Sequence, residues 1–165
     1  MNFSYRNAFS RNVGWVTIAE QDRLRHARIA IAGLGGVGGA HLLTLSRLGI
    51  SNFHISDFDE FDIHNLNRQA GAFMSYMGKP KLDTMAQMAR DINPTSDIKL
   101  FPKGVQSDNV DEFLAGVDVY VDSLDFQRDR FFGVFGPDLR LLAMSHLAML
   151  GGAGDTQRAQ AEFGV

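Results

Sequence analysis

Cysteine is absent from this sequence of 165 residues, and that absence excludes several kinds of chemistry. Without a thiol, the chain cannot form a disulfide scaffold, bind zinc through thiolates, carry a redox pair or use a cysteine nucleophile. The five histidines also lack the i, i+4 spacing that is typical of metal ligands on one helix. A cytoplasmic location agrees with the lack of cysteine.

Long apolar runs and a strong charge of one sign are missing as well. No segment reaches the roughly 18 apolar residues of a membrane span, and the first residues lack the apolar stretch of a signal peptide. The net charge of -3 gives no general electrostatic reason to expect binding to nucleic acid or to an anionic membrane. The sequence therefore predicts a protein that does not attach to membranes.

What is present is typical of a folded domain. Hydrophobic residues make up 45% of the chain and charged residues 21%, as in ordinary globular proteins. The length suits one domain.

Apolar runs alternate with helical patterns through the middle of the chain. Strands are expected at 28–33, 52–57, 97–101 and 117–122, and helices at 36–48, 79–92 and 110–114. Strands that alternate with helices indicate an α/β fold with a mostly parallel sheet and helices on both faces. Right-handed crossovers place the carboxyl ends of all strands at one edge, where such sheets bind ligands.

Three parts of the chain differ in their composition and residue patterns. Residues 1–27 are expected to form an N-terminal arm with a helix at about 17–26, and residues 28–130 a nucleotide-binding domain. Residues 131–165 form an atypical segment, in which 131–137 hold too much glycine for a good helix and 139–150 suit a last strand or a strand and a turn. A truncated copy, one partner of a split enzyme and a sequence altered from about residue 131 remain open. The apolar side chains of this segment would favour self-association.

A glycine loop lies between the first expected strand and the first long helix. Its sequence is Gly33-Leu34-Gly35-Gly36-Val37-Gly38, which fits G-x-G-x-x-G in the strand–turn–helix context that nucleotide binding requires. Glycines let backbone N–H groups approach a phosphate at the positive end of a helix. Asp57 follows about 20 residues later, where an acid that binds ribose is expected. The plainer alternative is a turn that only packs helix on strand, and NAD, FAD and ATP all remain possible ligands. The cofactor-binding glycines are predicted to be Gly33, Gly35, Gly36 and Gly38.

Charged and amide side chains gather after the second expected strand. The segments are Asp57-Phe58-Asp59-Glu60-Phe61-Asp62, Asn65-Leu66-Asn67-Arg68-Gln69 and Gly78-Lys79-Pro80-Lys81, and Asp125 follows the fourth strand. Arginine and lysine neutralise phosphate oxygens, and carboxylates hold Mg²⁺. Each of these segments alone would more often be a solvated loop or turn, but together they suit a charged triphosphate.

These segments together resemble the ThiF/MoeB/HesA family, the adenylating domain shared with ubiquitin-activating enzymes. The glycine loop, Asp57-Phe58-Asp59, Asn65-Leu66-Asn67-Arg68-Gln69, Gly78-Lys79-Pro80-Lys81, Ile92-Asn93-Pro94 and Val121-Asp122-Ser123-Leu124-Asp125 carry the resemblance. Their order and spacing match the family from about residue 11 to residue 130.

The resemblance implies a Rossmann-like fold and ATP-dependent adenylation of a carboxylate, which yields acyl-AMP and pyrophosphate. The carboxylate would be the C-terminus of a ubiquitin-like or sulfur-carrier protein, or a related acceptor that includes tRNA. By matching position, Asp57 and Asp59 would hold the ribose and the metal region. The residues that would contact phosphates are Asn65, Arg68 and Lys81, with Gln69 close by. Asp125 would bind Mg²⁺. Arg11 would reach the ATP of a partner subunit, so the resemblance implies a homodimer; the alternative is an ordinary surface arginine.

The chain also departs from the family. Many members carry a catalytic cysteine or a zinc site with paired C-x-x-C motifs, and neither is present, so a thioester step within this chain is excluded. A non-catalytic nucleotide-binding or scaffold subunit of a split activating enzyme is the alternative function. An NAD(P)-dependent oxidoreductase would explain only the glycine loop and Asp57, and would leave Arg68, Lys81 and Asp125 without a role.

Overall fold

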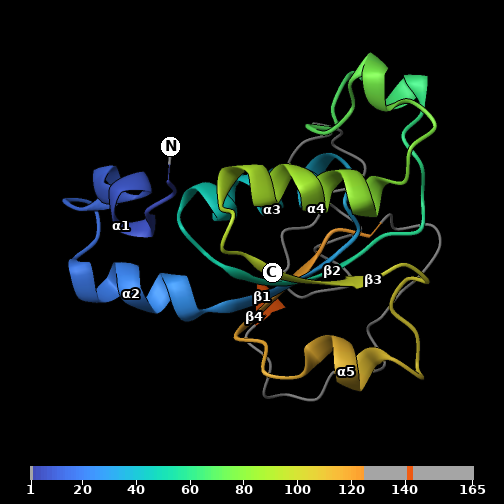
Figure 1. Ribbon diagram of the computed structural model, residues 1–165. Coiled ribbons are helices and arrows are strands. Elements are labelled where there is room, and N and C mark those ends of the chain that lie inside the picture. The colour runs from blue at the N-terminus through green and yellow to red at the C-terminus, as the bar shows by residue number, and fades with distance from the viewer. Residues whose placement is uncertain (1, 125–140, 143–165) are drawn as a thin grey trace, which may run out of the picture.

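A computed structural model describes residues 2–124 and 141–142 (Figure 1). Its sheet has the order β3-β2-β1-β4-β5, and every neighbouring pair of strands is parallel. The strands are β1 (Arg28–Ala32), β2 (Asn52–Ser56), β3 (Asp97–Phe101), β4 (Val119–Asp122) and β5 (Leu141–Leu142). The chain moves outward from β1 to β2 and β3, and then returns to the other side of β1 to form β4. The carboxyl ends of β1 and its neighbours are therefore the expected place for a ligand.

Helices cover both faces of the sheet, as the sequence predicts (Figure 1). On one face lie α3 (Gly36–Arg47) and α4 (Lys81–Ile92), and on the other lies the short α5 (Val110–Leu114). Alternate residues of β1 belong to two separate cores: Ile31 packs in the larger cluster with α3 and α4, and Ala32 in the smaller one beside α5. Both faces of the strand are buried, which is why its sequence reads as an unbroken apolar run.

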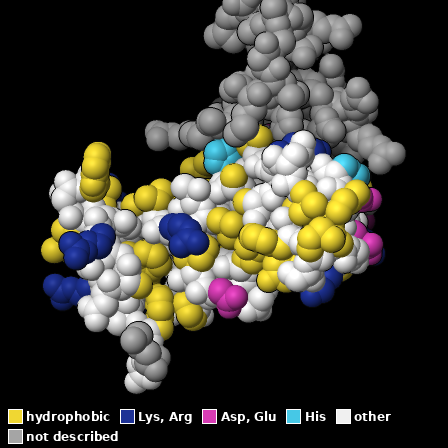
Figure 2. Space-filling view, turned by 90° about the horizontal axis from the view of Figure 1, so that it is seen from above, with side chains coloured by type: hydrophobic (Ala, Val, Ile, Leu, Met, Phe, Trp, Pro, Cys, Tyr) yellow, Lys and Arg dark blue, Asp and Glu magenta, His cyan; other side chains and the backbone are white. Residues whose placement is uncertain are grey.

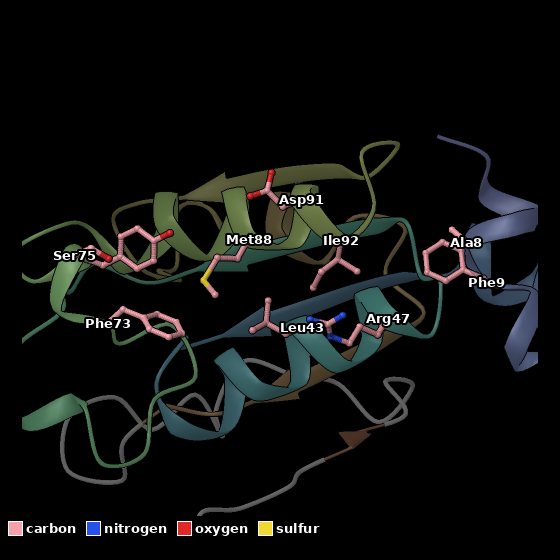
Figure 3. Close-up of a pocket in the computed structure, with 10 residues that line it drawn as sticks. Ala8, Phe9, Leu43, Arg47, Phe73, Ser75, Met88, Asp91 and Ile92 are labelled. Carbon is pink, nitrogen blue, oxygen red and sulfur yellow. The ribbon is translucent and has the colours of Figure 1, made fainter. Parts of the chain in front are cut away.

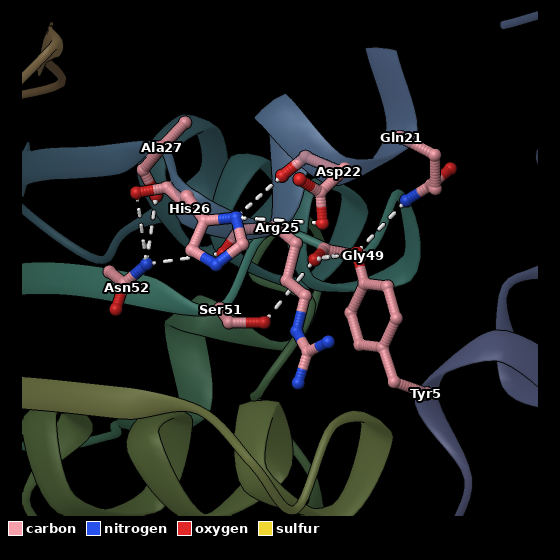
Figure 4. Close-up of polar contacts among 9 residues, drawn as sticks. All are labelled: Tyr5, Gln21, Asp22, Arg25, His26, Ala27, Gly49, Ser51 and Asn52. Atoms are coloured by element: carbon pink, nitrogen blue, oxygen red, sulfur yellow. Dashed lines mark hydrogen bonds and ion pairs between the residues drawn. The ribbon is translucent and has the colours of Figure 1, made fainter. Parts of the chain in front are cut away.

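The N-terminal arm is fixed to the body through the C-terminal end of α3 (Figure 4). It contains α1 (Tyr5–Ala8), a 3₁₀ turn at Ser10–Asn12 and α2 (Ile18–His26). Gln21 of α2 donates to the Leu48 carbonyl at 2.9 Å and to the Tyr5 hydroxyl at 3.0 Å, and that hydroxyl donates to the Gly49 carbonyl at 2.6 Å. The arm thus supplies partners for carbonyls that a helix end leaves free.

The expected elements agree closely with the observed ones in the described part of the chain. The arm helix is confirmed at Ile18–His26, where Thr17 and Glu20 form a capping box. The fourth helix starts at Lys81 rather than at residue 79, because Pro80 has extended geometry and caps it. Of the expected strand at 139–150, only Leu141–Leu142 lies within the described residues. No helix in the described ranges is long and apolar enough to cross a membrane.

Candidate nucleotide-binding site

A pocket of about 360 Å³ opens at the carboxyl ends of the strands. Five segments form it: the β1–α3 glycine loop, the loop after β2, the start of α4, the β3–α5 loop and the end of β4. Most of the residues predicted from the sequence line it, namely Gly33, Gly35, Gly36, Asp57, Asp59, Asn65, Arg68, Gln69 and Lys81. Segments far apart in the sequence therefore meet at the sheet edge that the topology indicates.

The glycine loop needs glycine for two different reasons. Gly33 has a φ of +85°, and a Cβ there would lie 2.8 Å from the Ser123 carbonyl oxygen. Gly38 does not line the pocket, and its Cβ would lie 1.9 Å from the carbonyl oxygen of Gly33. In this structure Gly38 lets α3 approach β1, which is a known use of the third glycine of such loops, and its place among the cofactor-binding glycines stays a prediction.

Asp57 connects the glycine loop to the acidic loop. Its Oδ2 accepts the N–H of Leu34 at 2.6 Å, and its Oδ1 accepts the N–H of Asp59 at 2.8 Å. Burial raises the pKa of Asp57, while these two hydrogen bonds and the charge of Lys81 act in the opposite direction. A carboxylate offers about four acceptor positions, so two remain for the hydroxyls of a sugar.

Lys81 is the buried cation of the pocket. Its side chain is 6% exposed, and Nζ lies 3.1 Å from Oδ2 of Asp59. The backbone N–H of Lys81 also donates to the Asp59 carbonyl at 2.9 Å. This pair joins α4 to the acidic loop, and it uses only one of the three hydrogens of the ammonium group.

Arg68 and its neighbours Asn65 and Gln69 also line the pocket. Arg68 is exposed, and its Nη1 donates to the His64 carbonyl and to Asn67 Oδ1, both at 3.0 Å. A guanidinium has five N–H donors, so several remain for phosphate oxygens. Asn65 is buried, and its Oδ1 accepts the N–H of Asp62 at 2.9 Å, which holds this loop in shape. Gln69 is 7% exposed, and among the described atoms its Oε1 has no hydrogen-bond partner.

The remaining predicted site residues are Arg11 and Asp125. Arg11 is exposed on the arm, which attaches to the opposite end of α3 from the glycine loop (Figure 1). Asp125, the predicted Mg²⁺ ligand, lies outside the described residues. Within the described ranges there is no cluster of three or more His, Asp or Glu side chains that could hold a metal ion by itself.

Some lining residues were not predicted from the sequence, among them Phe58, Lys103 and Ser123. Lys103 and Ser123 follow β3 and β4, so the rule that strand carboxyl ends meet at one edge could have found them. Phe58 is 56% exposed and stands between the two acids already singled out.

The fold and the pocket define a class: parallel α/β proteins with a pocket between a glycine loop and the carboxyl ends of the strands. A family model described as the ThiF family matches residues 9–132. The chain belongs to the ThiF family.

Known proteins of several activities are similar to this chain. The tRNA threonylcarbamoyladenosine dehydratase of Bacillus subtilis is 32% identical over 118 residues, which cover 71% of this chain and 46% of that protein. The SAMP-activating enzyme E1 of Haloferax volcanii is 32% identical over 105 residues, covering 64% and 39% of the two chains. Among solved structures, the E. coli tRNA N6-threonylcarbamoyladenosine dehydratase TcdA in complex with ATP has a TM-score of 0.70 at 29% identity, covering 73% of this chain and 50% of that one. The chain thus spans half or less of the length of these relatives.

Proposed function

We propose that this protein is an ATP-dependent adenylyltransferase that activates a carboxylate as acyl-AMP and releases pyrophosphate. The observation that carries the proposal is the position of two cations, Arg68 and Lys81, at the same pocket as the N-terminal end of α3. A dehydrogenase needs an acid for the ribose and a dry nicotinamide pocket, whereas this arrangement suits a chain of phosphates. Relatives whose names describe activating enzymes, and a relative solved with ATP, support the same choice.

The glycines and the amide of Gln69 support the assignment of this pocket to ATP. Gly35 and Gly36 lack side chains where the backbone must approach a phosphate, and a Cβ on Gly36 would lie 3.5 Å from Cγ of Arg68. The buried, unpaired Oε1 of Gln69 suits a donor on a ligand.

Mg²⁺ would bind through oxygen ligands, because it prefers carboxylates, water and phosphate oxygens. Asp59 provides an exposed carboxylate at the pocket, and Asp125 is the predicted protein ligand. When bound, the ion would neutralise charge on the phosphates and on the leaving pyrophosphate.

The chemical step requires no nucleophile from the protein. An oxygen of the substrate carboxylate forms a bond with the α-phosphorus, the bond from that phosphorus to the bridging oxygen of pyrophosphate breaks, and pyrophosphate departs with that electron pair. Charge on the phosphate oxygens grows during this exchange. Arg68, Lys81 and the N–H groups at the start of α3 would stabilise that charge, and each such donor is worth a few kcal/mol.

The acceptor that we propose is the C-terminus of a ubiquitin-like or sulfur-carrier protein, or tRNA. These classes agree with the relatives of this chain, which include a SAMP-activating enzyme and tRNA threonylcarbamoyladenosine dehydratases. We assign the nucleotide chemistry to residues 28–130, and contact with a second subunit to the arm at residues 1–27. The cytoplasmic location remains a prediction of the sequence.

We also propose a homodimer in which Arg11 acts on the partner's nucleotide. A groove of about 810 Å³ crosses the outer face of α3 and α4, with Leu43, Met88 and Ile92 on its walls (Figure 3). Phe9 of the arm lies at one end and Phe73 at the other (Figure 3). Figure 2, which views the molecule from this side, shows hydrophobic side chains gathered over it.

A second copy suits this groove because the apolar residues at its two ends are complementary under a two-fold axis. The arm carries Trp15, which is 95% exposed, and Ile18, which is 69% exposed, while Phe73 and Met74 at the far end are 51% and 68% exposed. A two-fold axis through the middle of α3 would bring the arm of each copy to the Phe73 end of the other. The same rotation would carry Arg11 toward the partner's glycine loop, since α3 is only about 18 Å long.

Thermal unfolding of the full chain tests the nucleotide assignment. ATP with Mg²⁺ at about 100 times its Kd would add about 2.7 kcal/mol, which is a rise in Tm of roughly 5–10 °C for this size. The expected result is a rise with Mg-ATP and none with NADH. A rise with NADH alone would overturn the proposal. ATP binding without pyrophosphate exchange, in assays with a Gly-Gly carrier protein and with tRNA, would favour the alternative of an incomplete subunit of a split enzyme.

A further inference from the structure

One peptide group of the glycine loop is held at both of its polar atoms. The carbonyl oxygen of Gly33 accepts a hydrogen bond from the Ser123 hydroxyl at 2.7 Å, and the N–H of Leu34 donates to Asp57 at 2.6 Å. Ser123 follows β4 and Asp57 follows β2, the two strands that flank β1. The peptide between Gly33 and Leu34 is therefore fixed from both sides of the sheet.

The Ser123 hydroxyl fits a confined space. Its Oγ also donates to the Ala32 carbonyl oxygen at 2.7 Å, so the single hydrogen of the hydroxyl is shared between two carbonyls. The Ser123 backbone N–H donates to the Ala32 carbonyl as well, at 3.0 Å. A Cβ on Gly38 would lie 2.3 Å from this Oγ. The hydroxyl thus fills the gap between the end of β4, the glycine turn and α3.

The orientation of this peptide determines the direction of the groups that follow it. Gly35 and Gly36 come next in the chain and line the pocket, and the first N–H groups of α3 have no partner within their helix. Rotation of the Gly33–Leu34 plane would turn this part of the loop, and with it the N–H groups that are proposed to face phosphate.

We propose that Ser123 is a positioning residue for phosphate binding: by holding the Gly33 carbonyl, its hydroxyl aims the N–H groups of the glycine loop at the phosphates of the nucleotide. This inference rests on the proposed function, because it assumes that the pocket binds ATP. Ser123 acts through the loop, while Asp57 holds the other end of the same peptide.

The test compares ATP and adenosine binding to the full chain by calorimetry, for the wild type and for Ser123→Ala. One lost hydrogen bond to the loop predicts an ATP Kd about three- to tenfold higher. Adenosine, which carries no phosphate, should bind with unchanged affinity. Ser123→Cys, whose thiol is a weak donor, should have an intermediate ATP Kd, and Ser107→Ala at an exposed position outside the pocket is the matched control.

A merely structural role for Ser123 would give a different result. Ser123→Ala would then weaken ATP and adenosine equally, or would lower Tm without a change in ATP affinity, and either outcome would overturn the inference. The amide NMR signals of Gly35 and Gly36 without ligand provide a readout that does not need ATP binding. If the wild type fails to bind ATP, the proposed function fails, whereas unchanged Gly35 and Gly36 signals in Ser123→Ala would refute the positioning role itself.

Discussion

Nζ of Lys81 lies 3.1 Å from Oδ2 of Asp59, so the buried cation of the site is paired with a carboxylate. The two partners differ in their exposure to solvent: the lysine side chain is 6% exposed and the aspartate side chain is 55% exposed. A triphosphate that takes over the ammonium would therefore displace the carboxylate toward solvent, and Lys81 could stay where α4 holds it.

Lys81→Met should weaken ATP binding by about 10- to 100-fold, since a hydrogen bond to a charged group contributes about 1.5–3 kcal/mol. Methionine keeps the unbranched shape of the buried side chain, so Tm without ligand should change little. Calorimetric titration with Mg-ATP measures the effect. Lys79→Met is the matched control, because Lys79 is exposed and lies 5.0 Å from the Tyr76 ring, outside the pocket lining. An equal loss in both variants would refute a specific role for Lys81.

Two glycines of the same loop should respond differently to alanine. Gly38→Ala places a Cβ 1.9 Å from the Gly33 carbonyl oxygen, so we expect a loss of about 1–3 kcal/mol or more in the free energy of unfolding. Gly35→Ala meets its nearest atom, Gln69 Nε2, only at 3.8 Å, so stability should stay near that of the wild type while ATP affinity falls. Urea unfolding and ATP titration of both variants separate the packing role of Gly38 from the phosphate-binding role of Gly35. A loss of stability in Gly35→Ala and a loss of ATP affinity alone in Gly38→Ala would mean that the two roles are misassigned.

The N-terminal arm should contribute to ATP binding only when the protein is a dimer. Phe73→Glu, at an exposed groove position, should convert the dimer to monomer in sedimentation experiments. Gln87→Glu, at an exposed position of α4 outside the groove lining, should not. Arg11→Ala should stay dimeric and weaken ATP binding. In the monomeric Phe73→Glu background, Arg11→Ala should add no further loss, because coupled residues are not additive. Full additivity of the two changes would contradict action across the dimer.

Stability should fall in mild acid because of His54. This residue of β2 is buried, and its Nδ1 donates to the Phe113 carbonyl at 2.6 Å. Burial lowers the pKa of His54 from its usual 6.5; the hydrogen bond to Phe113 raises it, Arg28 and Lys99 lower it, and Asp97 raises it. The unfolded chain therefore takes up a proton near pH 6.5 that the folded chain binds only at lower pH, so the free energy of unfolding decreases as pH falls below 6.5.

His54→Gln keeps a donor for Phe113 but cannot be charged, so its Tm should depend less on pH between 5 and 7.5. His26→Gln, at an exposed residue of α2, serves as the matched control and should keep the wild-type slope. Thermal scans at several pH values measure both. Equal slopes for the wild type and His54→Gln would show that His54 does not cause the acid sensitivity.

The regular helices and strands could be predicted because their apolar patterns, and the residues that end them, can be seen within short stretches of sequence. The apolar run of β1 and the Asn93–Pro94 stop after α4 correspond to real boundaries. Short elements such as α1 and the 3₁₀ turn at Met74–Tyr76 were missed, since four or three residues carry no period. A long-range contact that helps to hold α1 is the hydrogen bond from the Tyr5 hydroxyl to the Gly49 carbonyl.

The sequence predicted which residues lie at the site better than it predicted what each of them does there. The rule that strand ends share an edge brought Asp57, Arg68 and Lys81 together correctly. How tightly Gly38 packs is shown only by the structure, in which its Cβ would lie 1.9 Å from the Gly33 carbonyl oxygen. Ser123 was part of a matching motif, but its hydroxyl has a role only because β4 ends beside the glycine turn.

Calorimetric titration of the full chain with Mg-ATP and then AMP measures most directly whether the pocket lined by Gly33 and Lys81 binds the phosphates of ATP. We predict a single site per chain, tighter binding of ATP than of AMP, and loss of that difference in Lys81→Met. Equal affinities for ATP and AMP in the wild type, or an ATP affinity indifferent to Lys81, would contradict this prediction.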